Sequence, residues 1–269
     1  MILRWLQNRK RRKLLASPFP LEWLEYLHKN VAHYRVLTDT EKAKLRDDLR
    51  IFIAEKYWEG CKGLEVTEEM KVTIAAQACL LLLCLEHDYF GRVKTILVYP
   101  EGFKPGHEDP LHEDLVNEDH IEALGQASYR GPVIVSWADA LTGGQNEADG
   151  LNVVLHEFAH ELDFLDGTFD GTPPLKDRAQ YQKWQEVMTQ EYNLLIRNAE
   201  KGKKTLLDQY GTENEGEFFA VATECFFEKP IAMSQKHPRL YELLREYFHQ
   251  DPAKRFETMK SGDAQSLRD

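Results

Sequence analysis

The sequence predicts an α+β fold that is mostly helical and contains a small sheet. Capping signals open long apolar or amphipathic segments before residue 90, and helical patterns return after residue 150. Between them the hydrophobic period changes, because the short runs 94–99 and 132–137 are rich in β-branched and aromatic residues and are bounded by turn residues. Helices therefore surround a small sheet, which is the α+β arrangement.

Three helices are expected first. An amphipathic helix covers 21–31, and a Thr-Asp-Thr-Glu capping box opens a second helix over about 38–57. A third helix is expected over about 67–85, opened by Thr-Glu-Glu. It is nearly all apolar beyond Val72, which places it in the middle of the fold.

The two strands and four further helices follow. The strand at 94–99 ends before Pro100, and Gly131 precedes the strand at 132–137. The stretch 106–114 between them is rich in His, Glu and Asp and invites a metal-site interpretation, but its irregular spacing and proline favour a solvated loop. The later helices are expected around 151–163, and at 175–199, 213–227 and 237–249.

Composition narrows the function classes. The chain has 269 residues and a net charge of −11, so general nucleic-acid binding is not expected. The basic residues within 4–13 are expected to form a solvated tail, with contact to anionic lipid or nucleic acid as the alternative. No secretory signal and no transmembrane segment are evident, so a cytoplasmic location is expected. The four cysteines contain no CxxC pair and are expected to be reduced thiols, not metal ligands.

The segment 155–163, Leu-His-Glu-Phe-Ala-His-Glu-Leu-Asp, contains the HExxH pattern of zinc peptidases. On a helix, His156 and His160 lie one turn apart on the same face, so both imidazoles can bind one metal ion. Glu157 would face a metal-bound water, where a carboxylate can act as general base.

Three fixed positions arise by chance in roughly a few per cent of chains of this length, so context decides. An apolar run precedes the motif, Asp149-Gly150 supplies a helix start and Asp166-Gly167 a stop. The pattern indicates a helix buried on one side, where two histidines would need polar partners. A metal site is therefore the preferred interpretation.

A catalytic zinc site needs a third protein ligand and leaves a fourth position to water. Asp166 lies six residues after His160, where one peptidase class has this ligand, but Asp163 stands at the position of the glycine that would turn the chain back. Another class takes a glutamate from a neighbouring helix. Glu217 is the best candidate, since two phenylalanines and then small residues follow it. Glu224, on the same face, is either a partner of a metal ligand or a solvated charge.

Three segments resemble the Mlc titration factor A family of bacterial zinc peptidases: HEFAHELD at 156–163, GPVIVSW at 131–137 and YGTENEGEFFAVATECFF at 210–227. The resemblance covers most of the chain, including its overall length and the VYP segment at 98–100. The two helical motifs are also similar to the catalytic domain of anthrax lethal factor, where the similarity is confined to the site. The N-terminal region is less similar to the family.

The resemblance implies a set of roles. Zn²⁺ would be bound by His156, His160 and Glu217, with Glu157 as the base. Tyr210 would steady the oxyanion or leaving group, and Asp163 would orient a ligand. The site would be of the gluzincin type, with the HExxH helix packed beside a glutamate-bearing helix. Residues 1–90 would form an N-terminal helical region and 91–269 the catalytic region, together one compact unit.

The function expected is zinc-dependent hydrolysis of peptide bonds in a peptide or protein substrate, and the resemblance suggests aminopeptidase-type cleavage. If the strand at 132–137 lies at a sheet edge near the cleft, it could bind an extended peptide by strand addition, with Val133 and Val135 as contact positions.

The rival hypothesis is a non-catalytic regulatory protein. The resemblance implies binding and sequestration of a glucose-responsive transcriptional repressor, and through it control of sugar-uptake genes. An acidic chain suits a basic DNA-binding partner. However, Glu157 is unexplained by binding alone, and a structural zinc site uses four protein ligands.

Overall fold

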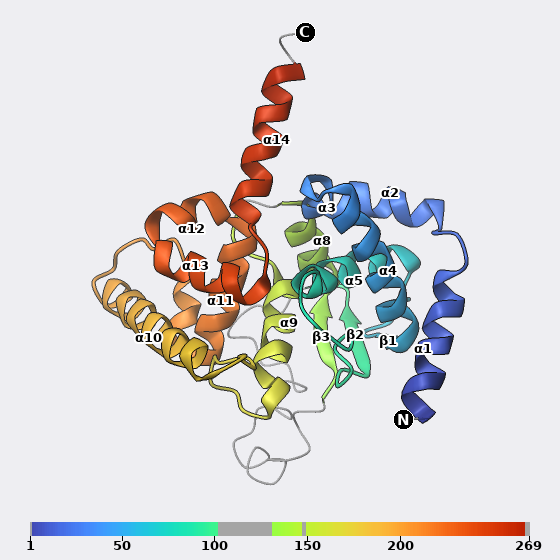
Figure 1. The fold of residues 1–269 in the computed structure, drawn as a ribbon, viewed down its shortest axis with the longest axis horizontal. Coiled ribbons are helices and arrows are strands. Elements are labelled where there is room, and N and C mark those ends of the chain that lie inside the picture. Colours follow the sequence, from blue (N-terminus) through green and yellow to red (C-terminus); the bar gives the residue numbers. More distant parts are fainter. Residues whose placement is uncertain (1, 102–130, 147–148, 267–269) are drawn as a thin grey trace.

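The computed structural model describes residues 2–101, 131–146 and 149–266, and within them helices predominate over a single small sheet (Figure 1). The predicted α+β class is confirmed. The polar stretch 106–114, with its alternative metal-site interpretation, lies outside the described residues.

The sheet has three parallel strands in the order β1-β2-β3, which are β1 (Tyr57–Gly60), β2 (Thr95–Tyr99) and β3 (Val133–Ser136). Alternate residues of β2 and β3 are buried, and the register pairs Ile96 with Val133 and Val98 with Val135. Both strands were predicted. The strand β1 was missed because its four residues alternate between exposed and half-buried, and carry no apolar pattern.

The helices before the sheet agree closely with the expected ones. They are α2 (Leu21–Asn30), the short α3 (Ala32–Val36), α4 (Asp39–Glu55) and α5 (Glu68–Leu82). Both hydrogen bonds of the capping box form, since Thr38 accepts from Glu41 N and the Glu41 carboxylate accepts from Thr38 N. Helix α5 is buried along nearly its whole length and contacts α2, α4, α8 and α9, so its predicted central place is confirmed (Figure 1).

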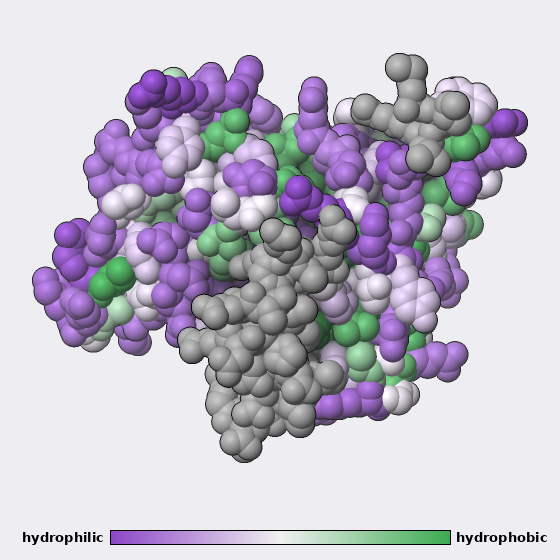
Figure 2. Space-filling model, turned by 90° about the horizontal axis from the view of Figure 1, so that it is seen from below, coloured by the Kyte–Doolittle hydropathy of each residue, from purple (hydrophilic) through white to green (hydrophobic). Residues whose placement is uncertain are grey.

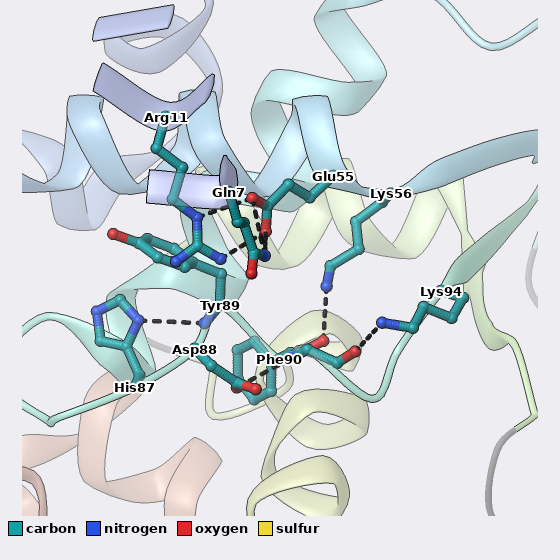
Figure 3. A network of polar contacts seen from close by, with 10 residues as sticks. Gln7, Arg11, Glu55, Lys56, His87, Asp88, Tyr89, Phe90 and Lys94 are labelled. Atoms are coloured by element: carbon teal, nitrogen blue, oxygen red, sulfur yellow. Dashed lines mark hydrogen bonds and ion pairs between the residues drawn. The ribbon is translucent and has the colours of Figure 1, made fainter. Parts of the chain in front are cut away.

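The basic segment is a helix, not a tail, although its basic side chains other than Arg11 are exposed, as expected, over the residues whose side chains are described. Residues Ile2–Leu15 form helix α1, which lies along α4. The Arg11 guanidinium donates two hydrogen bonds of 2.7 Å to the Glu55 carboxylate and lies 4.4 Å from the ring centroid of Tyr89 (Figure 3). These partners are 44 and 78 positions away along the chain, so local pattern could not reveal them.

The remaining helices follow β3 in the chain. They are α8 (Trp137–Gln145), α9 (Val153–Asp163), α10 (Arg178–Glu200), α11 (Glu215–Glu228), α12 (Pro230–Lys236), α13 (Pro238–Phe248) and α14 (Pro252–Ser266). Helix α9 lies between β3 and the group α10 to α13, and α14 projects from the body (Figure 1). The sequence did not predict α8, α12 or α14.

One hydrophobic core contains side chains from both sides of residue 90. Phe52 of α4, for example, contacts Phe158 of α9 at 5.6 Å between ring centroids. The four cysteines are free, as predicted. In the described part of the chain, no helix is both long and apolar enough to cross a membrane. The coloured residues on the face seen from below Figure 1 are largely hydrophilic, with hydrophobic side chains in small groups (Figure 2).

Candidate metal centre

The structure brings His156, His160 and Glu217 together. One ligand atom from each lies within 4.8 Å of the others. Glu217 Oε2 is 3.0 Å from Nε2 of His156 and 3.5 Å from Nε2 of His160. Two imidazole nitrogens and one carboxylate oxygen are ligands that suit Zn²⁺, and three protein ligands leave a position for water. The donor set therefore fits a catalytic zinc ion.

Helix α9 positions the two histidines. It begins one residue after Asn152, whose side-chain oxygen accepts a hydrogen bond from Leu155 N at 3.0 Å. The predicted start at Asp149-Gly150 was thus a few residues too early. A 3₁₀ turn, η2 (Phe164–Asp166), extends α9 to Gly167, whose φ of 101° closes it at the predicted stop.

Helix α11 supplies Glu217 from its first turn. Asn214 caps this helix by accepting a hydrogen bond from Glu217 N at 2.9 Å. Gly216 allows close packing, because a Cβ there would lie 2.4 Å from the ring of Phe169, which itself packs on His160. Helix α11 lies beside α9, which confirms the predicted pairing of the two helices.

Glu224 contacts His156, so it is not a solvated charge. Its Oε1 lies 2.7 Å from Nδ1 of His156, and its side chain is only 7% exposed. Its Oε2 accepts a hydrogen bond from the backbone N–H of Asn152 at 2.6 Å. The Asn152 amide also donates to Glu228 at 3.1 Å. One carboxylate therefore joins a candidate ligand to the N-terminus of its own helix.

The charges at the centre are strongly coupled. Burial by itself would lower the pKa of His156, but the hydrogen bonds to Glu217 and Glu224 outweigh it and raise the pKa to about 10. Burial would raise the pKa of Glu217, but His156 and His160 lower it to about 2. The two carboxylates thus favour positive charge at this position. A divalent metal ion bound there would be stabilised by the same carboxylates and would displace the proton held on His156.

Glu157 follows His156 on the helix and is half-buried. Burial raises its pKa, and the negative charges of Glu217 and Glu224 add to this, while the two histidines oppose it. A carboxylate with a raised pKa is better matched to proton transfer near neutral pH.

Tyr210 lies beside the same histidine. It belongs to the 3₁₀ turn η3 (Gln209–Thr212), which Asp208 caps by accepting from Tyr210 N at 2.8 Å. Its ring centroid is 6.0 Å from that of His156, and the residue is 53% exposed. Burial and the carboxylate of Glu217 raise its pKa, which keeps the phenol protonated as a donor.

The two aspartates near the end of α9 have other partners. Asp163 is fully buried and accepts a hydrogen bond from Gly171 N at 2.9 Å. Its Oδ1 and the Nδ1 of His160 have no hydrogen-bond partner among the described residues, so its suggested role in orienting a ligand stays a prediction. Asp166 accepts from the backbone and hydroxyl of Thr168 and is absent from the described metal-binding group.

The expectation for Val133 and Val135 needs correction. β3 is an edge strand of the described sheet, but these side chains are only 3% and 0% exposed and belong to the core. Alternation of faces along the strand directs them inward. Only the backbone of β3 is therefore left for strand addition, which stays a prediction.

Asn152 was missed in the sequence. It caps α9, binds Glu224 through its backbone and binds Glu228 through its side chain. The available signal was an asparagine immediately before an apolar helical run, which is a preferred N-cap. The helix start was instead predicted at Asp149-Gly150, a few residues upstream of this N-cap.

Comparison with known proteins points to a metallopeptidase family. The family model described as glucose-regulated metallo-peptidase M90 matches residues 5–249. An uncharacterized protein of Synechocystis is 36% identical over 249 residues, covering 92% of this chain and 90% of that protein. Mlc titration factor A of Klebsiella pneumoniae is 28% identical, covering 81% of this chain and 83% of the relative. Mlc titration factor A of Escherichia coli is 26% identical, with 93% of each chain covered.

Proposed function

The chain belongs to the glucose-regulated metallo-peptidase M90 family, and we propose that it is a zinc-dependent peptidase. The observation that carries the proposal is the convergence of His156, His160 and Glu217 within 4.8 Å, with Glu157 on the same helical turn as the first histidine. Bound at these three residues, zinc supplies Lewis-acid chemistry that polarises a scissile carbonyl and acidifies a water molecule.

The residues of the chain carry the proton transfers. Glu157 accepts the proton of the attacking water and passes it to the leaving amine, as its raised pKa favours. Tyr210, next to His156, donates a hydrogen bond to the developing oxyanion. Glu224 does not transfer a proton but accepts a hydrogen bond from Nδ1–H of His156, which would leave Nε2 as the metal-binding nitrogen.

A catalytic site explains the donor set better than a structural one. A structural zinc site uses four protein ligands, whereas the group found among the described residues has three. Aminopeptidase-type cleavage is the more specific form of the proposal. It predicts that acetylation of a peptide's α-amine abolishes cleavage.

The test is metal analysis combined with cleavage of a peptide library. Zinc-loaded wild type is expected to cleave peptides, to lose activity with a chelator and to regain it with added zinc. Glu157→Gln is expected to keep the wild-type zinc content and to lose ~10²-fold or more in kcat. Full activity in this variant would remove Glu157 as the base, and a zinc-free, inactive wild type would reject the proposal.

A second function is suggested by the relatives named Mlc titration factor A, which match most of this chain. We propose that the protein also binds a transcriptional repressor of sugar-uptake genes, through a surface separate from the proton-transfer groups. Glu157→Gln should then bind such a repressor as tightly as wild type does in a calorimetric titration. Failure of both proteins to bind would exclude this role.

A further inference from the structure

A cavity of about 460 Å³ opens beside His156. It lies between α8, the start of α9, α11 and the 3₁₀ turn η3, and Tyr210 forms part of its wall. Its volume is within the range of sites that bind small ligands. Because His156 and Tyr210 belong to the proposed catalytic centre, a peptide bound there can place a neighbouring side chain in this cavity.

Much of the cavity wall is apolar. Val153 of α9, Val221 of α11 and the exposed Leu151 line it. Gly143 of α8 allows the close approach of the α9 N-terminus, since a Cβ there would lie 2.9 Å from the Leu151 carbonyl oxygen. These walls suit the methylene stem of a long side chain.

Three aspartates line the same cavity: Asp139, Asp149 and Asp208. No lysine or arginine is among its lining residues, and none of the three aspartates forms an ion pair within the described ranges. Asp208 accepts one backbone hydrogen bond, from Tyr210, whereas both oxygens of Asp149 accept one, from Leu151 N and from the Asn146 side chain. Lone pairs remain on each carboxylate.

The acidic groups are not equivalent. The ammonium of Lys229 lies against Gly150, outside the cavity lining, and therefore weakens the field of the neighbouring Asp149. Asp139 and Asp208 form no ion pair in the part of the chain that the structure describes, and neither has the lining position next to Gly150 that Asp149 has. Glu224, the remaining acid in the wall, is already engaged by His156 and Asn152. Asp139 and Asp208 thus provide most of the charge available to a ligand.

We infer that this cavity selects a lysine or arginine side chain next to the cleaved bond, with its stem on Val153 and Val221 and its cationic end toward Asp139 and Asp208. The inference rests on the proposed peptidase function and specifies its substrate class. Each partly exposed ion pair contributes a factor of about 2 to 5, so two give an overall preference of roughly tenfold over an uncharged side chain of similar length.

The test uses quenched fluorescent peptides that differ at one position beside the scissile bond, carrying lysine, norleucine or glutamate. Norleucine matches the lysine stem but lacks the charge. Zinc-loaded wild type is expected to show kcat/KM in the order lysine, norleucine, glutamate, with about tenfold between the first two at low salt. The ratio should shrink as ionic strength rises.

The double variant Asp139→Asn/Asp208→Asn tests the assigned residues. Asparagine at 208 keeps an oxygen that can accept from Tyr210 N, so the turn that holds Tyr210 is preserved. The lysine-to-norleucine ratio is expected to fall to about 2 or less. The control Asp47→Asn/Glu65→Gln removes the same net charge from two exposed positions outside the cavity and should keep the wild-type ratio.

Binding provides a readout independent of turnover. Fluorescence anisotropy with Glu157→Gln should show the same order of affinity for the lysine and norleucine peptides. If wild type cleaves peptides but prefers lysine no more than norleucine, or if the double variant keeps the preference, the inference is wrong. It is also wrong if only α-amine acetylation, and not the side chain, changes kcat/KM. If wild type cleaves no peptide, the peptidase proposal fails, and equal affinity for both peptides would then reject the cavity assignment as well.

Discussion

Nδ1 of His156 lies 2.7 Å from Oε1 of Glu224, a residue 68 positions later in the chain. The other oxygen of the same carboxylate accepts from the backbone N–H of Asn152, at the start of the helix that carries His156. The orientation of a candidate ligand is therefore coupled to the N-terminus of its helix through one buried carboxylate.

Glu224→Gln should weaken zinc binding by ~10- to 100-fold, measured by competition with a chromophoric chelator. The neutral amide accepts less strongly from His156, and its NH₂ group cannot accept the Asn152 N–H. Glu213→Gln, on an exposed residue near the same helix, is the matched control and should bind zinc as wild type does. Equal zinc affinity in all three proteins would show that Glu224 does not support the ligand.

Glu217→Gln should lower the zinc content to well below one equivalent per chain after dialysis, because an amide is a poor zinc ligand. Asp166→Asn tests the other sequence-based candidate and should retain the full equivalent, since Asp166 bonds only to Thr168 among the described residues. Metal analysis by mass spectrometry separates the two. The opposite pattern would assign the third ligand to Asp166.

Tyr210→Phe should reduce kcat by ~10²-fold while KM changes little, because it removes one hydrogen-bond donor to the transition state. The ring contact with His156 and the backbone cap from Asp208 do not need the hydroxyl. Steady-state kinetics on one peptide, with zinc content checked in parallel, measures this. An unchanged kcat would exclude the phenol from the reaction.

The buried Lys56 is expected to make the free energy of unfolding depend on pH. Its ammonium is buried, donates to the Phe90 carbonyl at 2.6 Å and lies near Lys94 (Figure 3). Burial first, and Lys94 second, lower its pKa from 10.5 to about 8. Between these two values the unfolded chain binds more protons than the folded protein, so the contribution of Lys56 to the free energy of unfolding rises with pH across this window.

As the pH rises from 7 to 10.5, Lys56 should add up to about 3 kcal/mol to the free energy of unfolding of wild type. The variant Lys56→Met should lack this increase, and urea titrations at the two pH values measure it. The exposed-lysine variant Lys201→Met should follow wild type at every pH. If wild type and Lys56→Met differ by the same amount at both pH values, the pKa of Lys56 is not lowered in the folded protein.

The local sequence predicted those elements whose signal is contained in a few neighbouring residues. The capping box at Thr38, the apolar run of α5 and the HExxH spacing each depend on residues within one or two helical turns. Glu217 was preferred over Asp166 from the residues that follow it, and the resemblance between whole segments then implied the same ligand.

Other features depended on residues distant in the chain. β1 has no apolar alternation of its own and forms by pairing with β2, and α1 is held by Arg11 on Glu55. The inward direction of Val133 and Val135 likewise follows from which face of the sheet the helices cover.

The sequence by itself determined the identity and spacing of the candidate metal ligands and the helices that carry them, because a helix fixes relative side-chain directions over four residues. Only the tertiary structure decided what surrounds them. It placed Glu224 on His156, Asn152 between two glutamates, and three aspartates around a cavity beside Tyr210. These relationships arise from the packing of α8, α9 and α11, and packing between segments far apart in the chain leaves no periodic trace in either segment.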